Sequence, residues 1–228
     1  MSIKVRSRAA GAYLVVFAGT FFSHMVLTDT PDIGETNAQA VDFYAVAAHR
    51  VQIIAGFYAL VAAAACLVGV LATLLPPARA RGNEGVVSVA WMSGGAFIGL
   101  YLAGGAAFLV PTATVALNFT QAALDPVFAR TMVTWGDALL LIAAPVALAG
   151  CLAFTCRAAH VSGAMPRWLV YFGYAVAALC LLAGWTWFPL PITVIWALTA
   201  GVRLLIRPQR LSAQADDPDT HRELRSRV

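Results

Sequence analysis

Two histidines and a few charged residues beside long apolar stretches are the side chains of this sequence that could do chemistry. His24 and His49 lie near the ends of two apolar stretches, and four acidic residues lie between them: Asp29, Asp32, Glu35 and Asp42. Imidazole and carboxylate groups bind divalent cations, and two imidazoles can hold a haem iron. A metal or haem site that uses His24 and His49 is therefore one hypothesis. The alternative is that both histidines lie at a membrane surface, where water solvates the imidazole.

Asp137 is the acidic residue that falls deepest inside an apolar stretch. A charge at the centre of a bilayer costs at least about 2.5 to 3.5 kcal/mol, so such a carboxyl group normally faces a partner or a water-filled cavity. Arg130 lies two helical turns before Asp137, and Arg50 begins another apolar stretch, so either arginine is a candidate partner. We expect Asp137 either to form a proton or cation site or to pair with one of these arginines in a structural role.

The composition places these residues in a membrane protein. Of 228 residues, 61% are hydrophobic and only 11% are charged, whereas soluble domains are about 45–50% apolar and about 25% charged. This excludes an ordinary soluble enzyme, a disordered chain and a secreted disulfide scaffold. The formal net charge of +4 is too small to predict a nucleic-acid partner. The four cysteines lie outside the polar segments, so no disulfide is expected: Cys66, Cys151, Cys156 and Cys180.

Proline residues divide the apolar stretches into separate spans. Uncharged residues run from 168 to 202, which as one helix would reach about 52 Å and overshoot a hydrocarbon core of about 30 Å. The sequence Phe188-Pro189-Leu190-Pro191 breaks this run. Pro145 is expected to kink another span. The sequence predicts an all-α transmembrane bundle with six spans, at about 11–28, 50–75, 86–110, 132–156, 168–187 and 190–206.

The distribution of basic residues predicts the orientation of the bundle. Lys and Arg concentrate in cytoplasmic loops, and six spans with both termini in the cytoplasm leave Arg50 and Arg130 as the only basic residues outside. We therefore expect a multi-pass protein of a bacterial plasma membrane, with outer segments at 29–49 and 111–131. Residues 207–228 are polar and charged and are expected to form a disordered cytoplasmic tail.

Two local patterns predict where helices begin in the outer segments. Thr36 and Gln39 have the spacing of a capping box, which predicts a helix from near Asn37 that either bends near 47–50 before the second span or projects outward. Asp125 followed by Pro126 is typical of an N-cap with proline at the first helical position.

Small residues form a seam in the third span. Gly95, Gly99 and Ala103 share one helical face, which lets another backbone approach closely. We interpret this seam as a site of packing within the bundle, with self-association or a membrane-protein partner as the alternative.

Three segments carry a resemblance to other membrane proteins: residues 8–14 at the start of the first span, Phe43-Tyr44 with His49-Arg50 before the second, and residues 165–169 before the fifth. Through them the chain resembles uncharacterised six-helix membrane proteins of actinobacterial-type genomes. The resemblance implies a plasma-membrane location and carries over no site.

The sequence contains no phosphate-binding glycine loop, no His-Glu-x-x-His and no Gly-x-Ser-x-Gly motif, which favours a protein that is not an enzyme. We expect an accessory or regulatory subunit, or a binder of a lipid-like molecule without a cofactor. The alternatives are a redox or cation-handling protein, with a haem or metal site near the outer face, and a small-solute transporter.

Overall fold

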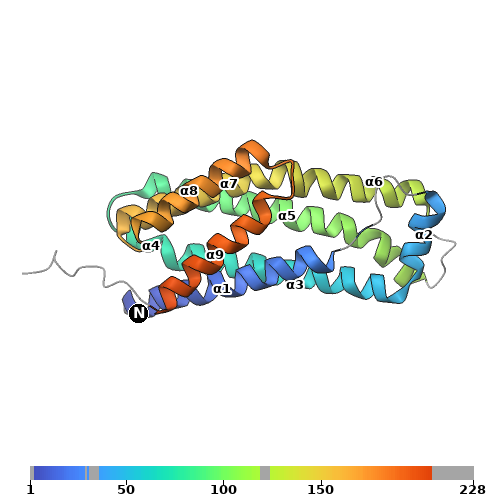
Figure 1. Ribbon diagram of the computed structural model, residues 1–228, viewed down its shortest axis with the longest axis horizontal. Helices are drawn as coiled ribbons and strands as arrows, with labels where there is room; N and C mark the ends of the chain where they lie inside the picture. Colours follow the sequence, from blue (N-terminus) through green and yellow to red (C-terminus); the bar gives the residue numbers. More distant parts are fainter. Residues whose placement is uncertain (1–2, 29, 31–35, 119–123, 207–228) are drawn as a thin grey trace, which may run out of the picture.

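The computed structural model describes residues 3–28, 30, 36–118 and 124–206, and these residues form helices and turns without a strand (Figure 1). The helices are α1 (Ile3–Leu27), α2 (Asn37–Ala45), α3 (Ala47–Leu74), α4 (Pro76–Arg79), α5 (Glu84–Asn118), α6 (Pro126–Asp137), the π-helix η2 (Ala138–Ala143), α7 (Ala144–Ser162), α8 (Arg167–Ala183) and α9 (Pro189–Ile206). The predicted tail at 207–228 lies outside the described residues.

Five of the described helical segments are long and apolar enough to cross a membrane. They are α1, α3 with α4, α5, the continuous run of α6, η2 and α7, and α9. Helix α8 is also apolar, but it has 17 residues. The chain is therefore an all-helical protein whose apolar helices contact lipid.

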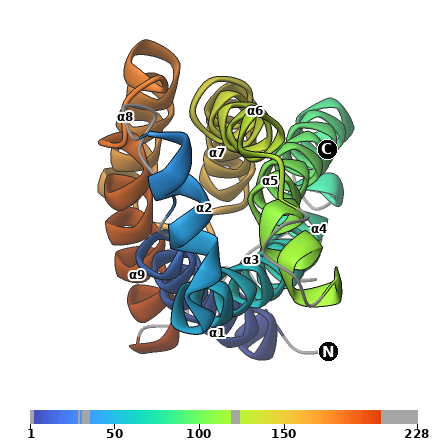
Figure 2. The same ribbon diagram turned by 90° about the vertical axis from the view of Figure 1, so that its right-hand side faces the viewer.

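Three helices extend beyond the others at one end of the bundle, which we call the α2 end. There α2 lies across the adjoining ends of α3, α5 and α6, whereas α1, α8 and α9 stop short of it (Figures 1 and 2). Tyr44 of α2 is fully buried in this region, in a small apolar cluster with Ile53, Val115, Leu124 and Ala129. The α2 end therefore has a core of its own, separate from the main core of the bundle.

Helix α5 is longer than the sequence predicts. A span that ends near residue 110 was expected because of Pro111, but α5 continues through Pro111 to Asn118. A proline inside a helix removes one backbone hydrogen bond. The last turns of α5 offset this loss because Val115 packs in the Tyr44 cluster, with Leu109 against it.

A π-helix lies just before Pro145, where the sequence predicts a kink. Pro145 has no N–H to donate to the carbonyl of residue 141, and the backbone changes its hydrogen-bond spacing in the preceding turn. The N–H of Ala144 donates to the carbonyl of Leu139, five residues earlier. The wider turn begins directly after Asp137.

The local start and stop patterns are confirmed. Thr36 and Gln39 form the predicted capping box at the start of α2, and the Asp125 carboxylate accepts a hydrogen bond from the N–H of Val127 at the start of α6. The bend between α2 and α3 occurs at Val46, which has extended backbone. The break between α8 and α9 is also present, but α8 ends at Ala183 instead of residue 187.

The predicted packing role of the small-residue seam is wrong. A methyl group added at Gly95 or Gly99 would meet no atom within 4 Å, because this face of α5 points away from the bundle. The inner face carries Gly94, Gly104 and Gly105, at which an added methyl group would collide with leucine side chains of α3 and η2. The register of α5 therefore puts the seam on the outer surface of the bundle.

Candidate functional site

A cavity of about 280 Å³ lies where α1, α5, the α6–η2 junction and the turn between α8 and α9 meet. Two residues singled out from the sequence, His24 and Asp137, line it together. Its lining is His24, Met25, Thr28 and Thr30 from the end of α1 and the residues after it, Tyr101 and Phe108 from α5, Asp137, Leu140 and Trp187. At about 30 Å³ per water molecule, this volume accommodates about nine waters or a small polar group with part of an apolar tail.

His24 is buried, and its ring is held by two polar contacts. Nδ1 lies 3.1 Å from the carbonyl oxygen of Gly56 in α3 and 3.0 Å from the hydroxyl oxygen of Thr28. An Nδ1–H that donates to the carbonyl leaves Nε2 as an acceptor in the neutral ring. Nε2 is therefore the ring nitrogen available to a molecule in the cavity.

Close packing of α1 against α3 sets the position of His24. A methyl group at Gly56 would lie 2.6 Å from the hydroxyl oxygen of Thr28, so only glycine permits this approach. A row of aromatic rings supports the other side of α1, where the ring centroid of Tyr101 lies 5.1 Å from that of Phe21 and 5.6 Å from that of His24. Both sides of the imidazole are thus fixed by neighbours.

Asp137 is the last residue of α6 and is partly buried. Within the described part of the chain, its carboxyl group forms no hydrogen bond or ion pair. Neighbouring Gly136 allows α5 to approach, because a methyl group there would lie 2.6 Å from the ring of Phe108. The carboxyl group therefore lines the cavity without a protein partner among the described residues.

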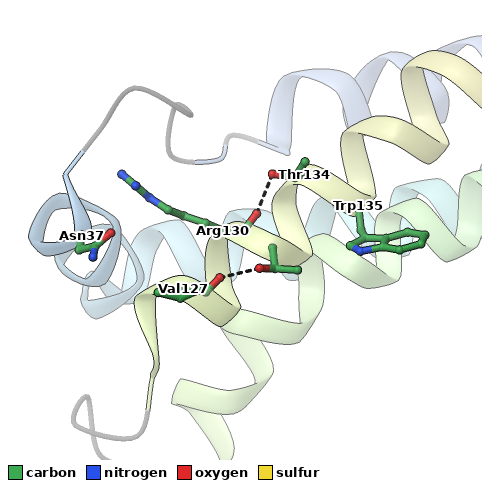
Figure 3. A pocket seen from close by; sticks show the side chains of 6 residues that line it. Asn37, Val127, Arg130, Thr134 and Trp135 are labelled. Carbon is green, nitrogen blue, oxygen red and sulfur yellow. Dashed lines mark hydrogen bonds between the residues drawn. The ribbon is translucent and has the colours of Figure 1, made fainter.

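Neither arginine considered from the sequence pairs with Asp137. Nη1 of Arg50 donates to the backbone carbonyls of Tyr44 and Ala45, both at 2.7 Å, and so caps the C-terminal end of α2. Arg130 lines a different hollow, and its side chain extends toward Asn37 at the start of α2 (Figure 3). The expected structural pair between Asp137 and an arginine is thus not formed.

His49 does not share the cavity with His24. Its ring stacks on Phe43 with a centroid separation of 4.2 Å, and Nδ1 lies 3.0 Å from the Phe43 carbonyl oxygen. Asp42 is exposed on α2, and Asp29, Asp32 and Glu35 lie outside the described residues. In the part of the chain that the structure describes, no three His, Cys, Asp or Glu side chains are placed to hold a metal ion.

Tyr44, in the apolar cluster of the α2 end, has a buried hydroxyl group without a hydrogen-bond partner in the described structure. Burial raises the pKa of the Tyr44 phenol above its usual value, because the phenolate would lose its hydration. The side chain therefore acts as a neutral core residue of the α2 end.

Sequence reasoning did not assign three aromatic residues of the cavity to a site: Tyr101, Phe108 and Trp187. Aromatic residues are common in apolar helices, so no sequence pattern marks them as lining residues. Aromatic faces attract cations, and a carboxylate attracts cations more strongly. The cavity thus combines a carboxyl group, three aromatic rings and one imidazole acceptor. No family model, curated protein or solved structure matches this chain.

Proposed function

We propose that this chain is a non-catalytic membrane protein that binds a lipid-like molecule with an ammonium head group in the cavity. One observation carries the proposal: the carboxyl group of Asp137, which has no partner among the described residues, and the imidazole of His24 line one cavity together with Tyr101, Phe108 and Trp187. The role of each part follows from its chemistry.

The carboxylate of Asp137 is the ionic partner of the ammonium group. A hydrogen bond between charged groups is worth about 1.5 to 3 kcal/mol, and each cation–π contact adds about 0.5 to 2 kcal/mol. Nε2 of His24 accepts a hydrogen bond from an N–H of the head group. The apolar side chains of Met25 and Leu140 contact the adjoining methylene groups.

The level of the cavity along the bundle fits an amphipathic ligand. It lies near the end of α1 and at the turn between α8 and α9, where Trp185 and Trp187 are exposed. Tryptophan side chains favour the boundary between lipid tails and water. A ligand with its head in the cavity would therefore extend its tail into the hydrocarbon region.

The proposal includes the topology expected from the sequence. Helix α8 is then the sixth span, both termini are cytoplasmic, and the α2 end projects outside the plasma membrane of a bacterium. The apolar composition of α8 and the basic residues near the opposite end support this arrangement. Labelling of single introduced cysteines in intact cells tests it, because only those at the α2 end should react with a membrane-impermeant maleimide.

Isothermal titration calorimetry with decylammonium, whose head group carries N–H donors, in a maltoside detergent tests the binding site. D137N should weaken binding at least tenfold, because it removes the ionic partner. D125N is the matched control, since it makes the same change at the start of the same helix and asparagine caps a helix as well as aspartate does. Equal affinity of D137N and D125N, or equal binding of the uncharged decanol, would contradict the proposal.

Cation handling is a second candidate, because two titratable side chains line one cavity inside a membrane protein. It covers proton movement, a small-solute transporter coupled to it, and the metal or haem site expected from the sequence, with Nε2 of His24 as the free ligand atom. Proton flux in proteoliposomes that is lost in D137N would favour it over lipid binding. An absorption spectrum and metal analysis of the purified protein test the haem and metal forms.

The outer seam of α5 extends the proposal to a partner. Gly95, Gly99 and Ala103 are exposed, and small residues on a lipid-facing surface let a second helix approach closely. We propose that this seam contacts either a second copy of the chain or another membrane protein, of which this chain is an accessory subunit. Gly99→Leu should abolish such an association in crosslinking of membranes, whereas Gly19→Leu on α1 should not.

A further inference from the structure

A second hollow, of about 490 Å³, lies beside α6 nearer to the α2 end (Figure 3). Its lining consists of Asn37 from α2 and Val127, Arg130, Thr131, Thr134 and Trp135 from α6. It shares no lining residue with the cavity of His24 and Asp137. What it holds is therefore a question independent of the proposed function.

The guanidinium group of Arg130 is the charged group of this hollow, and it lacks the acceptors that such a group needs. Nε and Nη2 are both buried and have no hydrogen-bond partner among the described residues. Arg50, in contrast, uses two backbone carbonyls. A buried charge without acceptors is unfavourable, so the hollow is suited to a molecule that supplies them.

The neighbouring side chains also favour an anion. The hydroxyl groups of Thr131 and Thr134 donate to the backbone carbonyls of Val127 and Arg130. Both hydroxyl groups are neutral, so they do not offset the charge of Arg130. The side chains of Asn37 and Trp135 can donate hydrogen bonds, and no acidic side chain is among the described residues of the lining. A planar guanidinium with free N–H groups matches the oxygens of a phosphate.

The position of Arg130 indicates that the phosphate belongs to a lipid head group. Arg130 lies two turns, about 10 Å along the axis, from Asp137 toward the α2 end. Trp135 is 60% exposed, as expected of an indole at a membrane boundary. We infer that the hollow binds the phosphate of an anionic lipid head group through Nε and Nη2 of Arg130.

Binding of dioctanoyl phosphatidylglycerol to the purified protein in maltoside detergent tests this site. Dioctanoylglycerol, which lacks the phosphate, should not bind there, and inorganic phosphate alone measures how much of the affinity comes from the phosphate without the lipid. R130Q should weaken binding of the phospholipid about tenfold, and R130K should do so less, because an ammonium keeps the charge but lacks the fork of N–H groups. R157Q is the matched control, since Arg157 is exposed on α7.

The unfolding temperature of lipid-free protein distinguishes a binding role of Arg130 from a structural one. Without lipid, R130Q should unfold at the wild-type temperature or above it, because it removes a charge that has no partner in the described structure. Inorganic phosphate that binds as tightly as the lipid, with the same loss in R130Q, would make a soluble phosphate compound the ligand and overturn the lipid assignment. Unchanged phospholipid binding in R130Q, equal binding of dioctanoylglycerol, or a lower unfolding temperature of lipid-free R130Q would overturn the site itself.

Discussion

Replacing Gly11 or Gly201 by alanine should destabilise the protein, because α1 and α9 are in backbone contact at these two residues. A methyl group at Gly11 would lie 2.8 Å from the carbonyl oxygen of Gly201, and one at Gly201 would lie 2.8 Å from that of Gly11. Ordinary contacts of such a methyl group begin at 3.4 Å, so the two helices would have to separate by about 0.6 Å, the difference between 3.4 and 2.8. Backbone cannot rotate away as a side chain does, and overpacking of this kind costs about 1–3 kcal/mol of the free energy of unfolding.

Gly19→Ala is the matched control, because Gly19 lies in the same helix and a methyl group there would meet nothing within 4 Å. The gain in helix propensity is common to all these substitutions, so the difference from the control isolates the collision. At about 2–4 °C per kcal/mol, the apparent melting temperature should fall by several degrees in Gly11→Ala and Gly201→Ala.

Tryptophan fluorescence during heating in detergent, at one fixed scan rate, measures these melting temperatures. The double variant should lose less than the sum of the two single losses, because one separation of the helices relieves both collisions. Melting of Gly11→Ala and Gly201→Ala at the temperature of Gly19→Ala would refute the backbone contact between α1 and α9.

Three other substitutions test the supports of the site. Arg50→Ala removes both hydrogen bonds to the carbonyls at the end of α2, so amide hydrogen exchange in α2 should rise severalfold, and no change would show that the cap is unimportant. Trp196→Phe removes the hydrogen bond to an α8 carbonyl and should lower the free energy of unfolding by about 1–2 kcal/mol in thermal unfolding. Trp185→Phe, at an exposed position, should leave it almost unchanged. Equal effects of the two substitutions would contradict the buried hydrogen bond. Gly56→Ala displaces the residues that hold His24 and should weaken decylammonium binding severalfold in calorimetry; unchanged affinity would contradict the role of His24.

Features that depend on neighbouring residues in the sequence could be predicted. The capping box of Thr36 and Gln39, the N-cap at Asp125 and the break between α8 and α9 each depend on side chains within a few residues. The continuation of α5 through Pro111 could not be predicted this way, because contacts of Val115 with α2 and α3 decide it. The outward direction of Gly95 and Gly99 depends on the rotation of α5 against its neighbours, which sequence spacing alone does not fix.

The candidate site was predicted in part. His24 and Asp137 were singled out as individual residues, but the hypotheses paired His24 with His49, and Asp137 either with an arginine or with a proton or cation. The structure places His24 and Asp137 in one cavity instead, because the end of α1 and the α6–η2 junction meet there. Pro145 indicates a local disturbance of this helix, but it does not indicate that the disturbance is a π-helix that begins directly after Asp137.

Photolabelling tests most directly whether an ammonium head group lies between His24 and Asp137. The probe is an alkylammonium with a diazirine on the first methylene groups of its tail, and the labelled peptides are identified by mass spectrometry. Labels should fall on the end of α1 near His24 and on the α6–η2 junction near Asp137, and excess decylammonium or the D137N substitution should abolish them. Labels confined to the outer faces of the bundle, such as those that carry Tyr58 and Leu182, and unchanged in D137N, would contradict ligand binding in this cavity.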